Sequence, residues 1–167
     1  MRKIVVTALR PLVICIALLG SAPVFAQGTN VAFGTIRQDT TAPVEVTADN
    51  LAVDQATEKA VFEGNVVIGQ GALRLSAQKV EVVYRASNTG IASLEASGGV
   101  TLVSGADAAE AERADYDIDS GTIVMTGDVL LTQGLSALTA QKMTVDLKDG
   151  TARMSGRVKT ILQNGSN

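Results

Sequence analysis

The feature of this sequence that most constrains its fold is an internal repeat. Residues 48–83 align without a gap on residues 111–146, a shift of 63, and 12 of the 36 aligned positions are identical. The identical positions include the pair Gln78-Lys79, which matches Gln141-Lys142. A repeat of this length indicates structural units that stack on one another and bury apolar faces that no single unit could bury alone.

A shorter spacing lies within this repeat, because a glycine, one variable residue and a valine recur four times. The copies are Gly64-Asn65-Val66, Gly98-Gly99-Val100, Gly127-Asp128-Val129 and Gly156-Arg157-Val158. They begin 34, 29 and 29 residues apart, so each unit has room for three or four strands of about 5 to 6 residues. The pattern predicts an all-β protein, a stacked antiparallel β-roll of roughly 14 to 16 short strands.

Alternation of apolar and polar residues begins at Val44 and continues through most of the chain, which is the period of half-buried strands. The alternation runs straight through the recurring glycine, so we expect each glycine to kink a continuous strand. It slips by one residue at Gln78 and again at Gln141, where we expect a bulge or corner. Residues 106–114 are rich in Ala and Glu, which makes a short helix an alternative, but we expect a loop that leads into a strand at Asp115.

The first 26 residues have the three regions of a secretory signal peptide. Basic residues at positions 2, 3 and 10 precede the apolar run 11–19, and small residues follow up to Ala26, after which we expect cleavage. A retained membrane anchor fits less well, because the run is shorter than the roughly 20 residues that span a bilayer. A lipoprotein signal fits less well because Cys15 lies inside the run. We expect a flexible N-terminal arm over 27–43, one β domain over 44–163 and a tail over 164–167.

The charge balance excludes one class of partner. Removal of residues 1–26 takes away three basic residues and no acidic ones, which leaves 11 Lys and Arg against 17 Asp and Glu. The formal charge of that chain is −6, and it has no basic stripe, so nucleic acid is not an expected partner. It also has no Cys, so a disulfide framework is excluded.

Ordered motifs give the sequence a family resemblance over residues 44–161. The first repeat contains Val46-Thr47-Ala48-Asp49, residues 60–66 (AVFEGNV), Gln70-Gly71 and residues 75–80 (LSAQKV). The second contains Gly127-Asp128-Val129, Gln133-Gly134, Ala140-Gln141-Lys142 and Asp149-Gly150. Together these motifs resemble the OstA-like family of periplasmic lipopolysaccharide-transport proteins, the LptA type.

The resemblance implies an open β-jellyroll, twisted and open at both ends, whose apolar interior holds the acyl chains of lipid A. It implies a periplasmic location and head-to-tail docking of protomers by strand pairing. It also implies partners at both membranes, namely an inner-membrane LptC-like protein and the N-terminal domain of an outer-membrane LptD-like translocon.

Apolar residues of one parity are the candidates for lining such an interior. After residue 26 the aromatic residues are Phe33, Phe62, Tyr84 and Tyr116, so the interior must be mostly aliphatic. An aliphatic trough suits acyl chains, because each buried CH₂ group contributes about 0.8 kcal/mol. The candidate lipid-binding residues are Val46, Phe62, Val66, Ile68, Leu73, Leu75, Val82, Ile123, Met125, Val129, Leu131, Leu138, Met143 and Val145.

The residues required by several kinds of catalysis are missing. The chain has no His, and its single Cys lies in the expected signal peptide, so Ser-His, Cys-His and imidazole-metal sites are excluded. The alternative function that remains is a carbohydrate-binding or carbohydrate-active β-solenoid that uses the acidic run 107–119. We prefer the lipid carrier, and we expect no catalysis and no cofactor.

The acidic run contains Asp115, Asp117 and Asp119, which have the spacing that opens a calcium loop. That loop needs Gly and Glu further along, where this chain has Ser120 and Thr126. We therefore expect no metal site. The repeat pairs Asp117 with Asp54, and a carboxylate that forms a turn explains this recurrence. By the same reasoning Lys79 and Lys142 are expected to be corner residues rather than ligands of lipid phosphates.

The first and last strands of the domain are the expected assembly edges. Residues 44–49 contain no interior Pro or Lys that would block pairing, and residues 157–163 alternate in the same way. An unpaired edge can accept a strand of another protomer, and a contact between two different surfaces propagates head to tail. The candidate edge residues are Val44, Val46, Val158 and Thr160.

Overall fold

A computed structural model describes residues 29–33, 39–85 and 90–162. The expected signal peptide over 1–26 and the tail over 164–167 lie outside the described residues. Eleven strands are present in the part of the chain that is described. They are β1 Thr29–Ala32, β2 Glu45–Thr47, β3 Asn50–Asp54, β4 Lys59–Gln70, β5 Leu73–Tyr84, β6 Ile91–Ser104, β7 Asp107–Asp117, β8 Thr122–Gln133, β9 Ser136–Asp146, β10 Thr151–Ser155 and β11 Lys159–Ile161.

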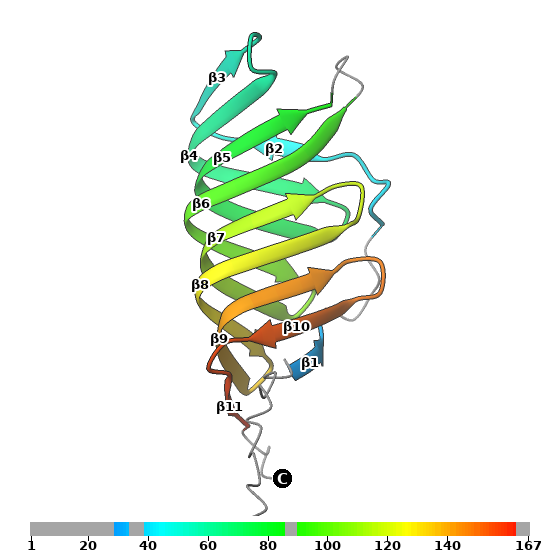
Figure 1. The fold of residues 1–167 in the computed structure, drawn as a ribbon, viewed down its shortest axis with the longest axis vertical. Helices are drawn as coiled ribbons and strands as arrows, with labels where there is room; N and C mark the ends of the chain where they lie inside the picture. Colours follow the sequence, from blue (N-terminus) through cyan, green and yellow to red (C-terminus); the bar gives the residue numbers. More distant parts are fainter. Residues whose placement is uncertain (1–28, 34–38, 86–89, 163–167) are drawn as a thin grey trace, which may run out of the picture.

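All eleven strands belong to one antiparallel sheet in which β4 to β9 are neighbours in chain order. At one end β2 and β3 both pair with β4, and at the other end β10 and β11 both pair with β9. The remaining strand, β1, pairs with β10. Figure 1 shows these strands stacked along the long axis, with β3 near the top and β1, β10 and β11 near the bottom.

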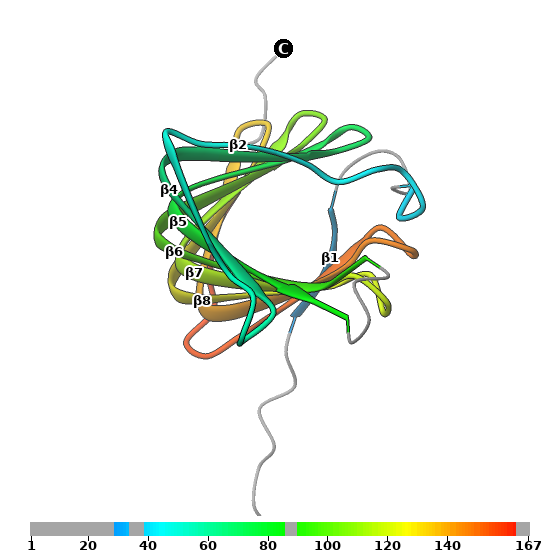
Figure 2. The ribbon, with the colours of Figure 1, turned by 90° about the horizontal axis from the view of Figure 1, so that it is seen from above.

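The sheet folds over on itself because each long strand bends near its middle, and Figure 2 shows two walls that meet at this bend. The bend lies where the register shifts between neighbouring strands. The first wall contains β3, residues 59–63, 79–84, 91–97, 113–117, 122–126 and 142–146, β10 and β1. The second wall contains β2, residues 66–70, 73–77, 100–104, 107–111, 129–133 and 136–140, and β11.

The bend is built by the recurring glycine pairs. At Gly64-Asn65, Gly98-Gly99, Gly127-Asp128 and Gly156-Arg157 both residues have positive φ, from 42° to 85°. The first three pairs each lie opposite a single residue of the next strand, so each is a bulge in which a continuous strand turns from one wall into the other. The fourth pair, Gly156-Arg157, lies between the end of β10 and the start of β11. The expected kink in a continuous strand is therefore confirmed at Gly64, Gly98 and Gly127, and so are the corners at Gln78 and Gln141. It was wrong at Gly156, where β10 ends and β11 follows as a separate strand.

The all-β class and the open jellyroll are confirmed, whereas the number of strands differs from the expected 14 to 16. Six strands, β4 to β9, have 11 to 14 residues each, about twice the usual length. The bulges bend the backbone without ending the strand, so one strand serves both walls. Strand β7 begins at Asp107, and the loop expected over residues 106–114 was therefore wrong.

The N-terminal arm also differs from expectation in its described part. Residues 29–32 form β1 along β10, and Phe33, only 2% exposed, is part of the apolar core. The amide of Phe33 donates a hydrogen bond to the carbonyl of Gly150 at 3.1 Å. Composition alone indicated a flexible segment here, because one buried aromatic ring and one strand pairing leave no periodic signal in so short a stretch.

Candidate functional site

The space between the two walls is apolar and filled by side chains that point inward at every second position. Leu102, Ile123, Met125, Leu131 and Met143 have no exposed surface. Among the buried apolar side chains that the structure describes, Phe33 and Tyr116 are aromatic and the others are aliphatic or Met. The interior thus resembles hydrocarbon in composition, since thioether and branched aliphatic side chains are flexible and nonpolar.

The structure brings all fourteen predicted lining residues to this interior. Twelve of them are buried, and the other two, Val46 and Phe62, are partly buried and pack against the core. They come from β2, β4, β5, β8 and β9 and from both walls. The alternation in the sequence therefore predicts correctly that these side chains face the interior.

Several interior residues were missed by the sequence reasoning. Strand β6 contributes Leu94, Ala96, Val100 and Leu102, which lie between the two copies of the repeat and so have no partner at a shift of 63. Further along the chain, Leu147, Ala152 and Met154 are also buried. The alternation in β6 and in β10 was a usable signal for all of these residues except Leu147, which follows the end of β9.

A polar bridge crosses the interior near the side of the roll opposite the bend. The hydroxyl of Tyr116, in the first wall, donates a buried hydrogen bond to Oε1 of Gln70, in the second wall, at 2.6 Å. Burial raises the pKa of Tyr116 to about 12, so the hydroxyl keeps its proton. The amide of Gln70 in turn donates to the carbonyls of Thr40 and Ala42 at 3.0 and 3.1 Å.

Gln133, the repeat partner of Gln70, also donates hydrogen bonds from its side-chain amide. The amide of Gln133 donates to the carbonyl of Ala32 at 2.7 Å and to Oδ2 of Asp107 at 2.9 Å. The two glutamines thus hold two described parts of the N-terminal segment against the second wall, and Figure 2 shows the stretch before β2 on the side away from the bend. Their identity across the repeat was visible in the sequence, but without the fold nothing indicated what they bind.

The acidic run lies mainly on the outer face of β7 and in the turn that follows. Glu110, Glu112, Asp115 and Asp117 are exposed, whereas the neighbouring Tyr116 is buried. Within the residues that the structure describes, no group of three or more Asp, Glu, Cys or His side chains could hold a metal ion.

Aspartates at the turns have a structural task. Asp117 accepts a hydrogen bond from the amide of Ser120 at 2.7 Å, and this bond lowers the pKa of the Asp117 carboxyl. Its repeat partner Asp54 accepts from the amide of Ala56 at 2.8 Å, which lowers its pKa in the same way. Asp119 forms an ion pair with Arg85. The predicted turn-forming role of Asp54 and Asp117 is confirmed.

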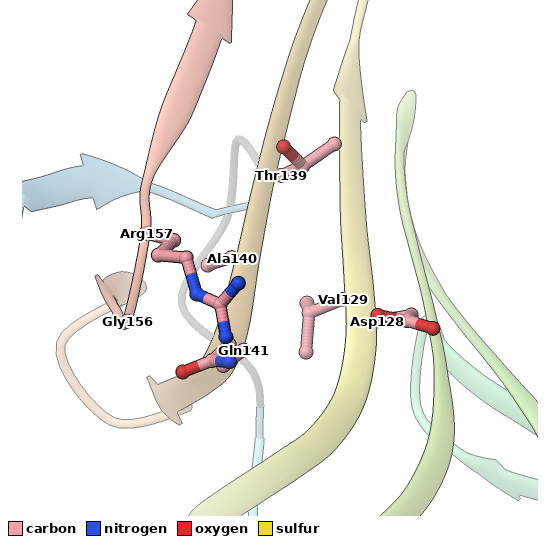
Figure 3. A pocket seen from close by; sticks show the side chains of 7 residues that line it. All are labelled: Asp128, Val129, Thr139, Ala140, Gln141, Gly156 and Arg157. Carbon is pink, nitrogen blue, oxygen red and sulfur yellow. The ribbon is translucent and has the colours of Figure 1, made fainter.

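The corner residues Lys79 and Lys142, and the hollows beside them, lie at equivalent positions in the two copies of the repeat. Lys79 and Lys142 are exposed next to the bend, and Lys79 pairs with Glu63 at 3.0 Å. Figure 3 shows a shallow hollow at the last bulge, lined by Asp128, Gln141 and Arg157 among others. An equivalent hollow lies at the first bulge, so the hollow follows from the geometry of the bend and is not evidence of a ligand site.

The two ends of the roll carry the predicted assembly edges. Val46 lies in β2, with Val44 just before it, and Thr160 lies in β11, with Val158 just before it. No described strand pairs with the outer side of β2 or of β11. Exposed apolar residues also gather at the ends: Leu51 and Val53 in β3 are 57% and 63% exposed, and Ile161 and Leu162 are 51% and 71% exposed.

The fold and sequence both match known proteins. A family model described as "LptA/(LptD N-terminal domain) LPS transport protein" matches residues 45–151, which include all of β2 to β9. The chain belongs to this family. A crystal structure of LptH from Pseudomonas aeruginosa, described as the LptA homologous periplasmic component of a lipopolysaccharide transport device, has the same fold as this family member. The TM-score is 0.67 at 16% identity, over 76% of this chain and 99% of that one.

In sequence, this chain is similar to an uncharacterized protein of Rhizobium meliloti (strain 1021). The two are 31% identical over 116 residues, which is 65% of this chain and 62% of the relative. The match therefore spans less than two thirds of the relative's length. The described part of the chain contains no helix that is long and apolar enough to cross a membrane.

Proposed function

We propose that this protein is a periplasmic carrier of lipopolysaccharide that holds the acyl chains of lipid A between its two walls. The observation that carries the proposal is the interior, which is continuous over both walls and almost entirely aliphatic. Side chains fill this space, so acyl chains would replace contacts between the walls. Such an exchange costs little, because hydrocarbon replaces hydrocarbon.

Head-to-tail assembly is the second part of the proposal. The second wall ends in β2 at one end of the roll and in β11 at the other, and both have unpaired outer edges among the described elements. Pairing β11 of one copy with β2 of the next would continue the wall, and the different edges make the contact heterologous. The same edges would serve an LptC-like partner at the inner membrane and an LptD-like partner at the outer membrane.

Photo-crosslinking tests the lipid-binding part. We would place the photoreactive residue p-benzoylphenylalanine at position 62, which has a half-buried ring facing the interior, and at the neighbouring position 61, which pairs with the outward Glu81. The purified chain from Gln27 would be mixed with lipopolysaccharide and irradiated. Crosslinking from Phe62→p-benzoylphenylalanine well above that from Val61→p-benzoylphenylalanine supports the proposal. Equal crosslinking from both positions, or none from position 62, contradicts it.

A further inference from the structure

The edge of the first wall at the C-terminal end of the roll is already occupied. Strand β1 pairs antiparallel with β10, with Asn30 opposite Arg153 and Val31 opposite Ala152. The other edge of the same wall is β3, and no described strand pairs with its outer side. The first wall thus has one edge covered by the chain's own N-terminal segment and one edge open.

The direction of β1 is the direction that β3 of a following copy would have. Each strand of the first wall, from β3 through β10, runs antiparallel to the one before it. Counting along this wall, β1 runs the same way as β3. A second copy stacked on the C-terminal end would therefore present its β3 to β10 in the antiparallel sense that β1 has now.

The sequences of the two strands match in order and in facing. Residues 30–33 read Asn-Val-Ala-Phe, and residues 50–53 read Asn-Leu-Ala-Val. Val31 lies opposite the buried Ala152 and Phe33 is itself buried. In β3, Leu51 and Val53 lie opposite Phe62 and Ala60, on the side that faces the interior.

The two matching strands differ in how well their apolar side chains are covered. Phe33 is 2% exposed and Val31 is partly buried against the core, whereas Leu51 and Val53 are more than half exposed. Side chains of this kind at an open edge gain about 25 cal/mol for each Å² of apolar surface that becomes buried. The edge that lacks a cover is thus the one that would gain from a partner.

We propose that β1 is an internal substitute for β3 of a second copy of this chain, and that the outer edge of β10 is the strand-binding site for that β3. Assembly through the first wall then requires β3 of the incoming copy to displace β1. This inference rests on the proposed head-to-tail assembly, and it adds that β1 and the incoming β3 compete for the same edge of β10. The second wall, open at β2 and β11, makes the first contact, and the exchange at β10 completes the junction.

An internal competitor lowers the apparent affinity between copies by the fraction of molecules in which the edge is free. The test uses pairs of cysteines, because the chain from Gln27 has none. Asn30→Cys with Arg153→Cys locks β1 in place, since directly opposite residues of an antiparallel pair are within disulfide range. Asn50→Cys with Arg153→Cys can bond only between copies, because β3 and β10 lie at opposite ends of the sheet.

Oxidation of the locked variant is expected to raise its dissociation constant by about tenfold or more, as measured by light scattering, and reduction is expected to restore it. The Asn50→Cys, Arg153→Cys variant is expected to give a ladder of covalent multimers on a non-reducing gel. Its control, Asn50→Cys with Asp115→Cys, places the second thiol on the exposed face of β7 in the middle of the wall and should give only a trace.

Two results would overturn the exchange while leaving the assembly itself intact. One is an oxidised locked variant that assembles as tightly as its reduced form. The other is a self-associating Asn50→Cys, Arg153→Cys variant with no more disulfide than the control. If every variant, including a chain that lacks residues 27–32, stays monomeric at high concentration, the proposed head-to-tail assembly is wrong and the exchange with it.

Discussion

Replacing Gly98 and Gly99 one at a time by Ala separates two costs of building the bend. Both residues have nearly the same backbone, with φ of 85° and 84°, and a side chain in this left-handed region costs about 1 to 2 kcal/mol. A Cβ added at Gly98 would lie 2.8 Å from Cβ of Gln78, whereas one at Gly99 would have no atom within 4 Å. Overpacking of this kind adds about 1 to 3 kcal/mol.

We therefore expect Gly99→Ala to lower the free energy of unfolding by about 1 to 2 kcal/mol and Gly98→Ala by about 2 to 5 kcal/mol. Urea unfolding of the chain from Gln27 measures both. Adding Gln78→Gly should recover the excess in Gly98→Ala and nothing in Gly99→Ala. Equal losses for the two single variants, or no recovery by Gln78→Gly, would show that the close approach of Gln78 is not what requires glycine at position 98.

Three further predictions concern the interior. The pKa of Tyr116 is about 12 in the folded protein and about 10 in the unfolded chain. The contribution of Tyr116 to the free energy of unfolding is therefore fully present below pH 10 and is lost as the pH rises from 10 to 12. Urea unfolding should show a loss of roughly 2 to 3 kcal/mol over this range that is absent in Tyr116→Phe. Gln70→Ala leaves the Tyr116 hydroxyl without its acceptor and should lower the free energy of unfolding by about 2 to 4 kcal/mol. Amide exchange at residues 39–42 should become faster, and unchanged exchange there would refute the anchoring role of Gln70. Met125→Asp places a charge in the apolar interior and should abolish lipopolysaccharide binding, whereas Val124→Asp on the outer side should preserve it; binding by a folded Met125→Asp protein would mean that the interior is not the lipid site.

The parts of the fold that follow from the sequence are those with a periodic signal. Alternation around Gly127 placed Ile123, Met125 and Val129 in the interior, because the side chains of a strand point alternately to its two faces. It could not show that one strand serves both walls, since the bend at Gly127-Asp128 keeps the alternation intact on both sides. The number of strands was overestimated for this reason.

Other features depend on contacts between distant segments and left no local pattern. The start of β7 is rich in Ala, which has a low strand propensity and a high helix propensity. Its strand is fixed by pairing with β6 and β8. Phe33 and β1 are placed by β10, more than a hundred residues away in sequence. Gln70 was noticed as a repeated residue, but its bonds to Thr40, Ala42 and Tyr116 required the three-dimensional arrangement.

The glycine pairs lie one above another along the roll, and those at Gly64, Gly98 and Gly127 are bulges that each lie opposite a single residue of the next strand. The backbone passes from one wall to the other through these bulges, at residues that already occupy the left-handed region. We expect this line of bulges to act as a hinge between the two walls, because the pairing between strands is interrupted there. Small rotations at each bulge would change the separation of the walls while the hydrogen bonds within each wall stay intact, so the interior could widen or narrow without any strand leaving the sheet.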